Sequence, residues 1–300
     1  MRIVVALGGN ALLRRGEPLE AELQKQNLTR AAKTLAALAR QHDLVITHGN
    51  GPQVGLLALQ AASYKDVQPY PLDVLGAETE GMIGYLIEQT LSSELPGREI
   101  ATLLTQVEVD AADPAFRAPT KPIGPVYGET EMRQLAAQAP WTFVKDGPGF
   151  RRAVASPEPQ RIREINVIKL LVNAGVVVIC AGGGGIPVVA TASGELHGIE
   201  AVIDKDLSAA HLAESVGAEA LLLLTDVPAV WTRWPASEGQ PIGRIASAQL
   251  RAMTFEPGSM APKVEAACRF AERKRRFAGI GAIDRAEAIL RGESGTIVAA

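Results

Sequence analysis

The sequence predicts an α/β protein with a mostly parallel central sheet covered by helices, interrupted by one small inserted subdomain. Short β-branched or leucine-rich runs such as RIVVAL, DLVITH and EALLLLTDV alternate with amphipathic stretches, a pattern typical of parallel strands joined by helices. A long proline-rich segment then breaks this alternation. A chain of 300 residues can bury a substantial core as one large domain or two lobes.

The individual elements follow from the two periodicities. Strands are expected at 2–7, 43–48, 99–106, 176–181 and 219–227. Helices are expected at 23–40, 77–92, 162–173, 207–216 and 262–276, several of them ended by Gly or Asn. From about 107 to 160 the apolar periodicity is lost, and at least seven prolines and the stretch TKPIGPVYG take its place. A loop of this length is uncommon without a role of its own, so we expect an inserted subdomain there.

Composition excludes several classes of protein. The 30 basic and 33 acidic side chains leave a net charge of −3, which gives no general attraction to nucleic acid or to an anionic membrane. Cys180 and Cys268 stand in no metal-binding or redox spacing, so we expect both in the core of a protein from a reducing cytoplasm. The apolar start of the chain is interrupted by glycines and is interpreted as a first strand. No apolar run reaches the length of about 18 residues that a membrane span needs.

Three glycine-rich turns follow predicted strands: GGNA after the first, HGNGPQVG after the second and GGGGIP after the fourth. In a parallel sheet these turns open at the carboxyl edge, where ligands of open α/β folds bind. Glycine N–H groups can approach phosphate oxygens closely. Each turn alone could be only a tight connection, but together they predict a phosphate site. The dipeptide Gly-Lys is absent and Pro187 replaces the third glycine of a dinucleotide fingerprint, which disfavours P-loop and Rossmann proteins.

Three lysines stand in unusual places. Lys205, beside the expected helix N-cap Asp206, and Lys263, after Pro262, are cations at helix N-termini, where the helix dipole disfavours them unless an anion shares the site. Lys121 is framed by prolines in the inserted segment. The three lysines therefore suggest a bound polyphosphate, although a nearby carboxylate could pair with any one of them. Two aspartates alone are too few for a dedicated metal cage, so no metal ligand is assigned.

In one order along the chain, the motifs VVALGGNALL, HGNGPQVG, TKPIGP, GGGGIPVV, EAVIDKD and GSMAPK resemble the carbamate kinases of the amino acid kinase family. The resemblance runs nearly end to end. It implies an open αβα sandwich, a homodimer and phosphoryl transfer between carbamoyl phosphate and ADP, with Mg²⁺ carried by the phosphates of ATP or ADP. It also implies a carbamate- and phosphate-binding half at 1–181, with the subdomain at about 107–160, and a nucleotide-binding half at 182–300.

The resemblance assigns roles to individual residues. It implies charge-stabilising roles for Lys121, Lys205 and Lys263, with Asp206 as the carboxylate that orients them. Substrate and phosphate contacts are implied for Gly8, Gly9, Asn10, Gly49, Asn50 and Gly51. Nucleotide contacts are implied for Thr225, Asp226, Val227 and Met260. Many relatives carry a lysine in the first strand, where this chain has Ala6, so the resemblance gives that cation's task to Lys121.

Two alternatives remain open at this point. One keeps the fold but phosphorylates another small carboxylate or a phosphonate, and the other is a nucleotide-binding sensor without activity. The TKPIGP segment and the first-strand alanine disfavour the former. The presence of all three lysines and Asp206 disfavours the latter.

Overall fold

The computed structural model describes residues 1–9, 12–13, 17–64, 66–139, 141–233, 236–256, 259–273 and 276–300. Its centre is an eight-stranded sheet in the order β13-β15-β14-β12-β1-β2-β9-β3. The strands are β1 (Arg2–Leu7), β2 (Asp43–His48), β3 (Ile100–Thr102), β9 (Val177–Ile179), β12 (Ala220–Thr225), β13 (Arg244–Ala246), β14 (Phe277–Ala282) and β15 (Thr296–Ala299). β14 and β15 run antiparallel, and each other neighbouring pair is parallel.

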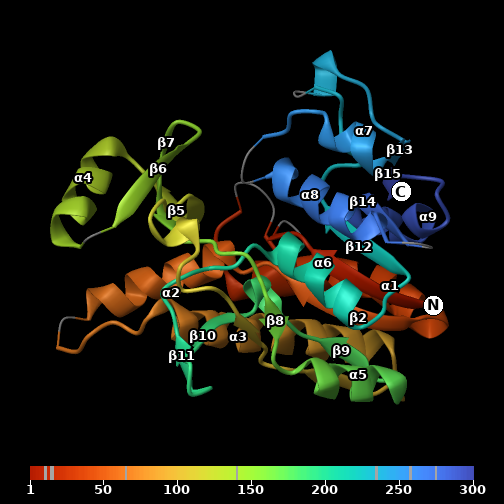
Figure 1. Cartoon of the computed structure of the whole chain (residues 1–300), viewed down its shortest axis with the longest axis horizontal. Helices are drawn as coiled ribbons and strands as arrows, with labels where there is room; N and C mark the ends of the chain where they lie inside the picture. The colour runs from red at the N-terminus through yellow and green to blue at the C-terminus, as the bar shows by residue number, and fades with distance from the viewer. Residues whose placement is uncertain are drawn as a thin grey trace.

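Helices cover both faces of this sheet, which makes three layers (Figure 1). One face packs against α1 (Ala21–Gln41), α3 (Leu72–Glu94) and α9 (Ala286–Leu290). The other face packs against α5 (Ile165–Asn173), α6 (Lys205–Ser215), α7 (Ser247–Arg251) and α8 (Met260–Ala271). Residues of β1 divide between the two cores by alternation, with Val4 and Ala6 in one and Ile3, Val5 and Leu7 in the other. The predicted α/β sandwich is therefore confirmed.

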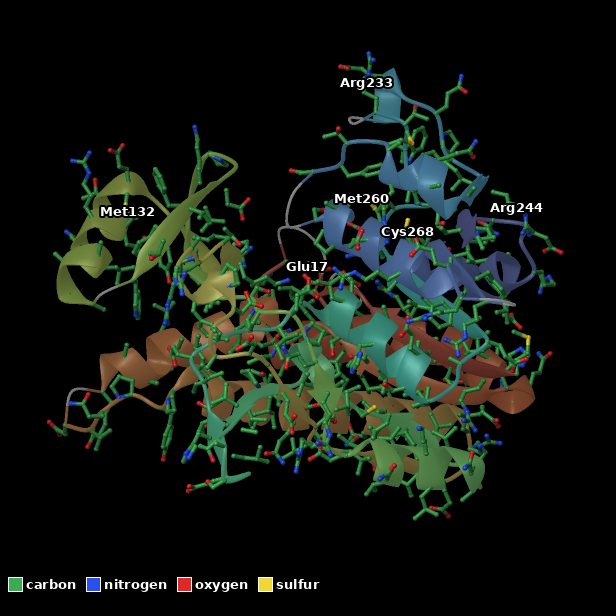
Figure 2. All side chains as sticks on the ribbon, viewed as in Figure 1. Glu17, Met132, Arg233, Arg244, Met260 and Cys268 are labelled. Atoms are coloured by element: carbon green, nitrogen blue, oxygen red, sulfur yellow. The ribbon has the colours of Figure 1, made fainter. Side chains whose placement is uncertain are left out.

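Two smaller sheets stand beside the central one. β11 (Leu196–Gly198), β10 (Ile186–Ala190), β4 (Gln106–Glu108) and β8 (Arg161–Ile162) form a four-stranded sheet in that order. β5 (Lys121–Tyr127), β7 (Gly149–Val154) and β6 (Thr142–Asp146) form a three-stranded antiparallel sheet that carries α4 (Glu129–Gln138). This last unit, residues 121–154, is called the protruding subdomain. It stands out from the body at the upper left of Figure 1. Met132 on its helix lies far from the labelled Met260 and Cys268 of α8 (Figure 2).

The protruding subdomain rests on α2 (Gly51–Ser63) through two glycines. A Cβ atom added to Gly55 of α2 would lie 1.9 Å from the Cα of Gly124 in β5. Gly124 also has a positive φ of 73°, which favours glycine. The close approach therefore requires a glycine at position 55, whereas at position 124 it is the backbone conformation that favours glycine.

Each expected strand and helix has a counterpart in the structure, but the structure adds elements and corrects two details. The strand expected at 99–106 is two short strands, β3 and β4, in different sheets. The sequence did not anticipate four helices, α2, α4, α7 and α9, or three strands of the central sheet, β13, β14 and β15. Nor did it anticipate the strands β5, β6, β7, β8, β10 and β11 of the smaller sheets. The N-cap of α6 is Asp204, whose Oδ1 accepts from the Asp206 and Leu207 amides; the expectation that Asp206 caps this helix is wrong. Both cysteines are buried and unpaired, as expected, and no helix among the described residues could cross a membrane.

Candidate active site

The glycine turns meet at one edge because strands β9, β2, β1 and β12 are neighbours in the sheet. The Gly8 amide donates to the Leu224 carbonyl at 2.8 Å, and the Gly49 amide donates to the Leu7 carbonyl at 3.1 Å. An added Cβ at Gly8 would lie 2.9 Å from the Leu224 carbonyl oxygen, whereas Gly9 and Gly51 face open space. The turns at Gly8, Gly9, Gly49 and Gly51 therefore form one surface at the carboxyl edge of the sheet, which is called the glycine floor. Asn10 lies outside the described residues.

The four-glycine run after β9 has a different reason for its bare backbone. Added Cβ atoms at Gly182, Gly183 and Gly184 would lie 2.2–2.4 Å from His48, Asn50 and the Ile203 carbonyl, respectively. The Gly182 amide donates to Glu80, and the Gly184 and Gly185 amides donate to backbone carbonyls. The hypothesis that the backbone amides of this run bind a phosphate is therefore wrong for Gly182, Gly184 and Gly185, whose amides already have protein acceptors. They let protein atoms of neighbouring elements pack closely.

Buried polar residues beneath the floor hold it in place. Asn50 donates to the Thr79 hydroxyl at 2.9 Å. Glu80 accepts from the Gly182 amide at 2.8 Å and from the Thr105 amide at 3.1 Å, and its burial raises its pKa to about 8. Burial also lowers the pKa of His48 to about 4, so this imidazole is neutral at pH 7. These buried groups support the glycine turns, and the His48 ring lies where a side chain on Gly182 would be.

Two of the three lysines converge on one carboxylate. Lys205, the first residue of α6, lies 2.5 Å from Asp206 Oδ1, and Lys263, in the first turn of α8, lies 3.1 Å from Asp206 Oδ2. The exposed fractions of these side chains are 12% for Lys205, 13% for Lys263 and 5% for Asp206. The stem of Lys205 passes over Gly49, whose Cβ position lies 3.4 Å from its Cδ and Cε atoms. The two ammonium groups therefore stand beside the glycine floor.

The charges in this cluster are mutually dependent. Burial would raise the pKa of Asp206, but Lys205 and Lys263 outweigh it and hold that pKa well below its usual range. Burial lowers the pKa of Lys205, and Asp206 only partly offsets this. For Lys263 the carboxylate outweighs burial, so its pKa lies above the usual value. One buried carboxylate thus keeps two cations together with a net positive charge, which suits an anionic ligand.

Lys121 reaches the same place from the protruding subdomain. It is the first residue of β5 and pairs with Asp204 Oδ2. Asp204 is two residues from Asp206, and the Asp206 amide donates to Asp204 Oδ1 at 2.9 Å. The structure therefore brings all three lysines to two aspartates at the start of one helix.

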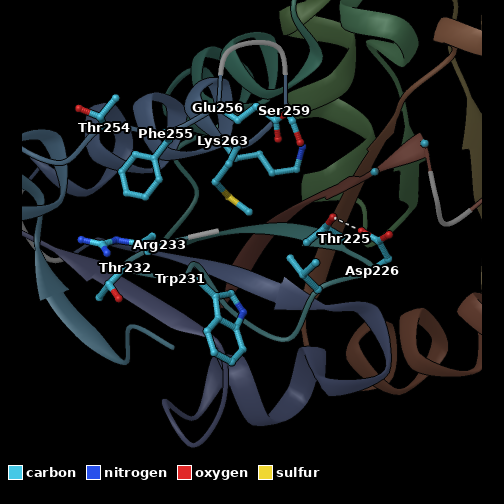
Figure 3. Close-up of a pocket in the computed structure, with 14 residues that line it drawn as sticks. Thr225, Asp226, Trp231, Thr232, Arg233, Thr254, Phe255, Glu256, Ser259 and Lys263 are labelled. Atoms are coloured by element: carbon cyan, nitrogen blue, oxygen red, sulfur yellow. Dashed lines mark hydrogen bonds between the residues drawn. The ribbon is translucent and has the colours of Figure 1, made fainter. Parts of the chain in front are cut away.

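A cavity of about 460 Å³ adjoins this cluster (Figure 3). Gly8, Gly9 and Lys263 line it together with the four residues for which nucleotide contacts are implied, Thr225, Asp226, Val227 and Met260. The Thr225 hydroxyl donates to Asp226 Oδ1 at 3.0 Å. The cavity therefore links the glycine floor and one lysine to a space outside the end of β12.

Half of the residues that line this cavity were not predicted from the sequence. Its further lining residues are Trp231, Thr232, Arg233, Thr254, Phe255, Glu256 and Ser259. They come from two irregular segments, one after β12 and one before α8, and Figure 3 shows Trp231, Arg233 and Phe255 around the space. The segments have no periodicity that would mark them. An aromatic pair with an arginine suits a planar, anionic ligand.

The fold and the site together define a phosphotransferase of the α/β type, and comparison with known proteins agrees. The model of the amino acid kinase family matches residues 1–280. The chain belongs to the amino acid kinase family, and within it to the carbamate kinases.

This narrower placement rests on close relatives that align along nearly the whole chain. The chain is 53% identical to a carbamate kinase of Rhizobium meliloti (strain 1021) over 99% of its own length and 93% of that protein. It is 52% identical to a carbamate kinase of Haemophilus influenzae, with 99% and 96% covered. The structure of Giardia lamblia carbamate kinase bound to AMP-PNP superposes with a TM-score of 0.90 at 35% identity, with 99% and 98% covered.

Proposed function

We propose that this protein transfers a phosphoryl group reversibly between carbamoyl phosphate and ADP, giving ATP and carbamate, which decomposes to CO₂ and ammonia. The convergence of Lys121, Lys205 and Lys263 on the aspartates beside the glycine floor carries this proposal. The relatives named as carbamate kinases support the choice of acceptor.

The reaction needs positioning and charge neutralisation more than covalent chemistry. The bond between phosphorus and the carbamate oxygen breaks, its electron pair stays with carbamate, and a terminal oxygen of ADP forms the new bond to phosphorus. Negative charge is spread over the transferred group during this step. Lys121, Lys205 and Lys263 would neutralise it, and Asp206 would orient the last two.

The two ligands would occupy adjoining parts of the edge. We place ADP or ATP in the cavity beside Thr225, Asp226, Val227 and Met260 for two reasons. The similar Giardia lamblia carbamate kinase has been solved bound to AMP-PNP, and aromatic residues line this space. Carbamate and the transferred phosphate would lie over Gly8, Gly9, Asn10, Gly49, Asn50 and Gly51. This arrangement divides the chain into a carbamate-binding half at 1–181 and a nucleotide-binding half at 182–300.

Magnesium would enter with the nucleotide as part of the substrate. Among the described residues no three His, Cys, Asp or Glu side chains are grouped to hold a metal ion, and the two carboxylates of the lysine cluster, Asp204 and Asp206, are paired with lysines. An ion bound mainly by phosphates fits this donor set. Its charge would add to that of the lysines between the phosphates.

We also propose a homodimer. Large apolar side chains are exposed on α3 (Met82, Tyr85), on α5 (Val167, Leu170) and at Leu104 beside α3, and the two helices lie along the same lower side of Figure 1. A second copy would bury this patch through a two-fold contact. Light scattering should give twice 31.7 kDa, and Leu170→Glu should lower this mass. We place the enzyme in the cytoplasm, because the two free cysteines fit a reducing compartment.

A substrate comparison tests the proposed reaction. The wild-type protein should form ATP from Mg·ADP and carbamoyl phosphate, and it should not consume ATP with acetylglutamate. ATP consumption with acetylglutamate alone would favour a kinase of another carboxylate. Nucleotide binding without turnover of either pair would favour the sensor. Lys205→Ala serves as the control for contaminating kinases, because it removes a proposed catalytic cation.

A further inference from the structure

The segment 200–204 is attached at three successive points to the protruding subdomain or to the residue that directly follows it. Arg152 lies 3.2 Å from Glu200, and the Val202 amide donates to the Ala155 carbonyl, just beyond β7, at 2.9 Å. The third point is the ion pair between Lys121 and Asp204. Immediately after these contacts the chain enters α6. The segment therefore joins the base of the subdomain to the helix that carries Lys205 and Asp206.

Asp204 uses its two carboxylate oxygens for these two tasks. Oδ1 caps α6 by accepting from the Asp206 amide at 2.9 Å and the Leu207 amide at 3.3 Å. Oδ2 accepts from Lys121, and the Asp204 side chain is only 10% exposed. One rigid group thus fixes the first turn of α6 and the end of a lysine from another part of the fold.

We propose that Asp204 is a positioning residue for phosphoryl transfer. It holds the ammonium group of Lys121 at a fixed position beside those of Lys205 and Lys263. A free lysine side chain loses roughly 2 kcal/mol of rotamer entropy when it is fixed. Since Asp204 fixes Lys121 before the reaction, this loss does not add to the barrier of the chemical step. Asp204 need not touch the substrate for this role. The inference rests on the proposed function.

Asp204→Asn separates the two tasks of this carboxylate. Asparagine caps helices about as well as aspartate, so α6 should be retained, while the charge that holds Lys121 is lost. We expect kcat to fall roughly 10-fold or more, the range for a lost hydrogen bond to a charged group, with the KM for ADP and the melting temperature little changed. Asp113→Asn is the matched control. Asp113 also caps a helical turn and accepts from the Ala115 amide, and this change should leave kcat unaltered.

A double-mutant cycle distinguishes positioning from a structural effect. If Asp204 acts through Lys121, Asp204→Asn should lower kcat little further in a Lys121→Ala background. Equal losses in both backgrounds, or a wild-type kcat in Asp204→Asn, would overturn the proposal. Should the asparagine variant fail to fold, Asp204→Ser, which also caps, is judged by the same two criteria.

A second readout does not depend on activity. Hydrogen exchange of the amides in β5 should be faster in Asp204→Asn than in the wild type, because the subdomain loses one of its attachments to segment 200–204. Unchanged exchange in β5 would contradict the attachment. A wild-type protein that forms no ATP would refute the proposed function instead, and the exchange measurement would still decide whether Asp204 holds Lys121.

Discussion

Replacing Asp206 with asparagine removes the carboxylate between Lys205 and Lys263 while keeping the size of the side chain. In the wild type this carboxylate is 5% exposed and contacts both ammonium groups. In the variant the two buried cations lose the carboxylate that contacts both of them. We therefore expect a loss of both stability and activity.

The size of the stability loss follows from the burial of the group. Removing one partner of a buried ion pair costs about 3–5 kcal/mol, because a charge remains buried without compensation. With an unfolding entropy of about 2.1 cal/mol/K per residue, the 300 residues give about 0.6 kcal/mol/K. The melting temperature of Asp206→Asn should then lie roughly 5–8 °C below that of the wild type.

Differential scanning calorimetry of both proteins without ligand at pH 7 measures this difference. Asp146→Asn is the matched control, because Asp146 lies 3.3 Å from Arg151 but is 44% exposed, and exposed pairs contribute about 1 kcal/mol or less. Because lysines depress the pKa of Asp206, its contribution is complete above the unfolded value of about 4 and is lost as pH falls through the folded value. The two melting temperatures should therefore converge at low pH.

The same substitution should change the activity at alkaline pH, whereas its effect on stability disappears at acid pH. Asp206 raises the pKa values of Lys205 and Lys263, so its removal lowers both, and the cations lose their protons at lower pH. The alkaline limb of the kcat/KM profile should move to lower pH in Asp206→Asn, and kcat at pH 7 should fall. A melting temperature equal to that of the wild type together with an unshifted profile would refute the view that this carboxylate organises the two lysines.

Three further changes test other parts of the structure. Lys121→Ala should lower kcat roughly 10²-fold with little change in ADP binding, and Lys121→Arg should restore only part of it; a normal kcat in the alanine variant would remove this lysine from the mechanism. Gly55→Ala places a Cβ atom 1.9 Å from the Cα of Gly124, so it should destabilise the folded protein by about 1–3 kcal/mol or more and lower kcat. The control is Gly76→Ala, whose Cβ meets nothing within 4 Å, and its effect on stability should be neutral or favourable. Burial depresses the pKa of His48 to about 4, so the unfolded state binds a proton at higher pH than the folded state does. The free energy of unfolding of the wild type should therefore fall by up to about 3 kcal/mol between pH 6.5 and pH 4, and this fall should be absent in His48→Gln. Urea titrations that give the same fall for both proteins would count against this.

The central strands and the position of the site could be predicted from the sequence because both depend on local pattern. An apolar run that ends in Gly8 or Gly49 is visible without a structure, and parallel strands bring their carboxyl ends to one edge. Helix α2 was missed because it begins with Gly51 and Pro52 and carries apolar residues on most sides, so it has no marked amphipathic period.

The remaining features depend on contacts between distant parts of the chain. A four-glycine run indicates that something approaches the backbone, but only the packed structure shows that His48 and Asn50 are what approaches. Asp204 and Asp206 are equivalent as caps in the sequence, and the partner Lys121, 83 residues away, distinguishes them. The cavity residues around Trp231 and Phe255 belong to irregular segments and come together only in the tertiary fold.

The central claim is that the lysines and the glycine floor pass a phosphoryl group directly between carbamoyl phosphate and ADP. Phosphorus NMR of the wild-type protein with Mg·ADP and carbamoyl phosphate follows both molecules at once. The account predicts that the carbamoyl phosphate signal is replaced by that of the γ-phosphate of ATP, and that Lys205→Ala slows this conversion strongly. Appearance of inorganic phosphate alone, at the rate seen without protein, would contradict it.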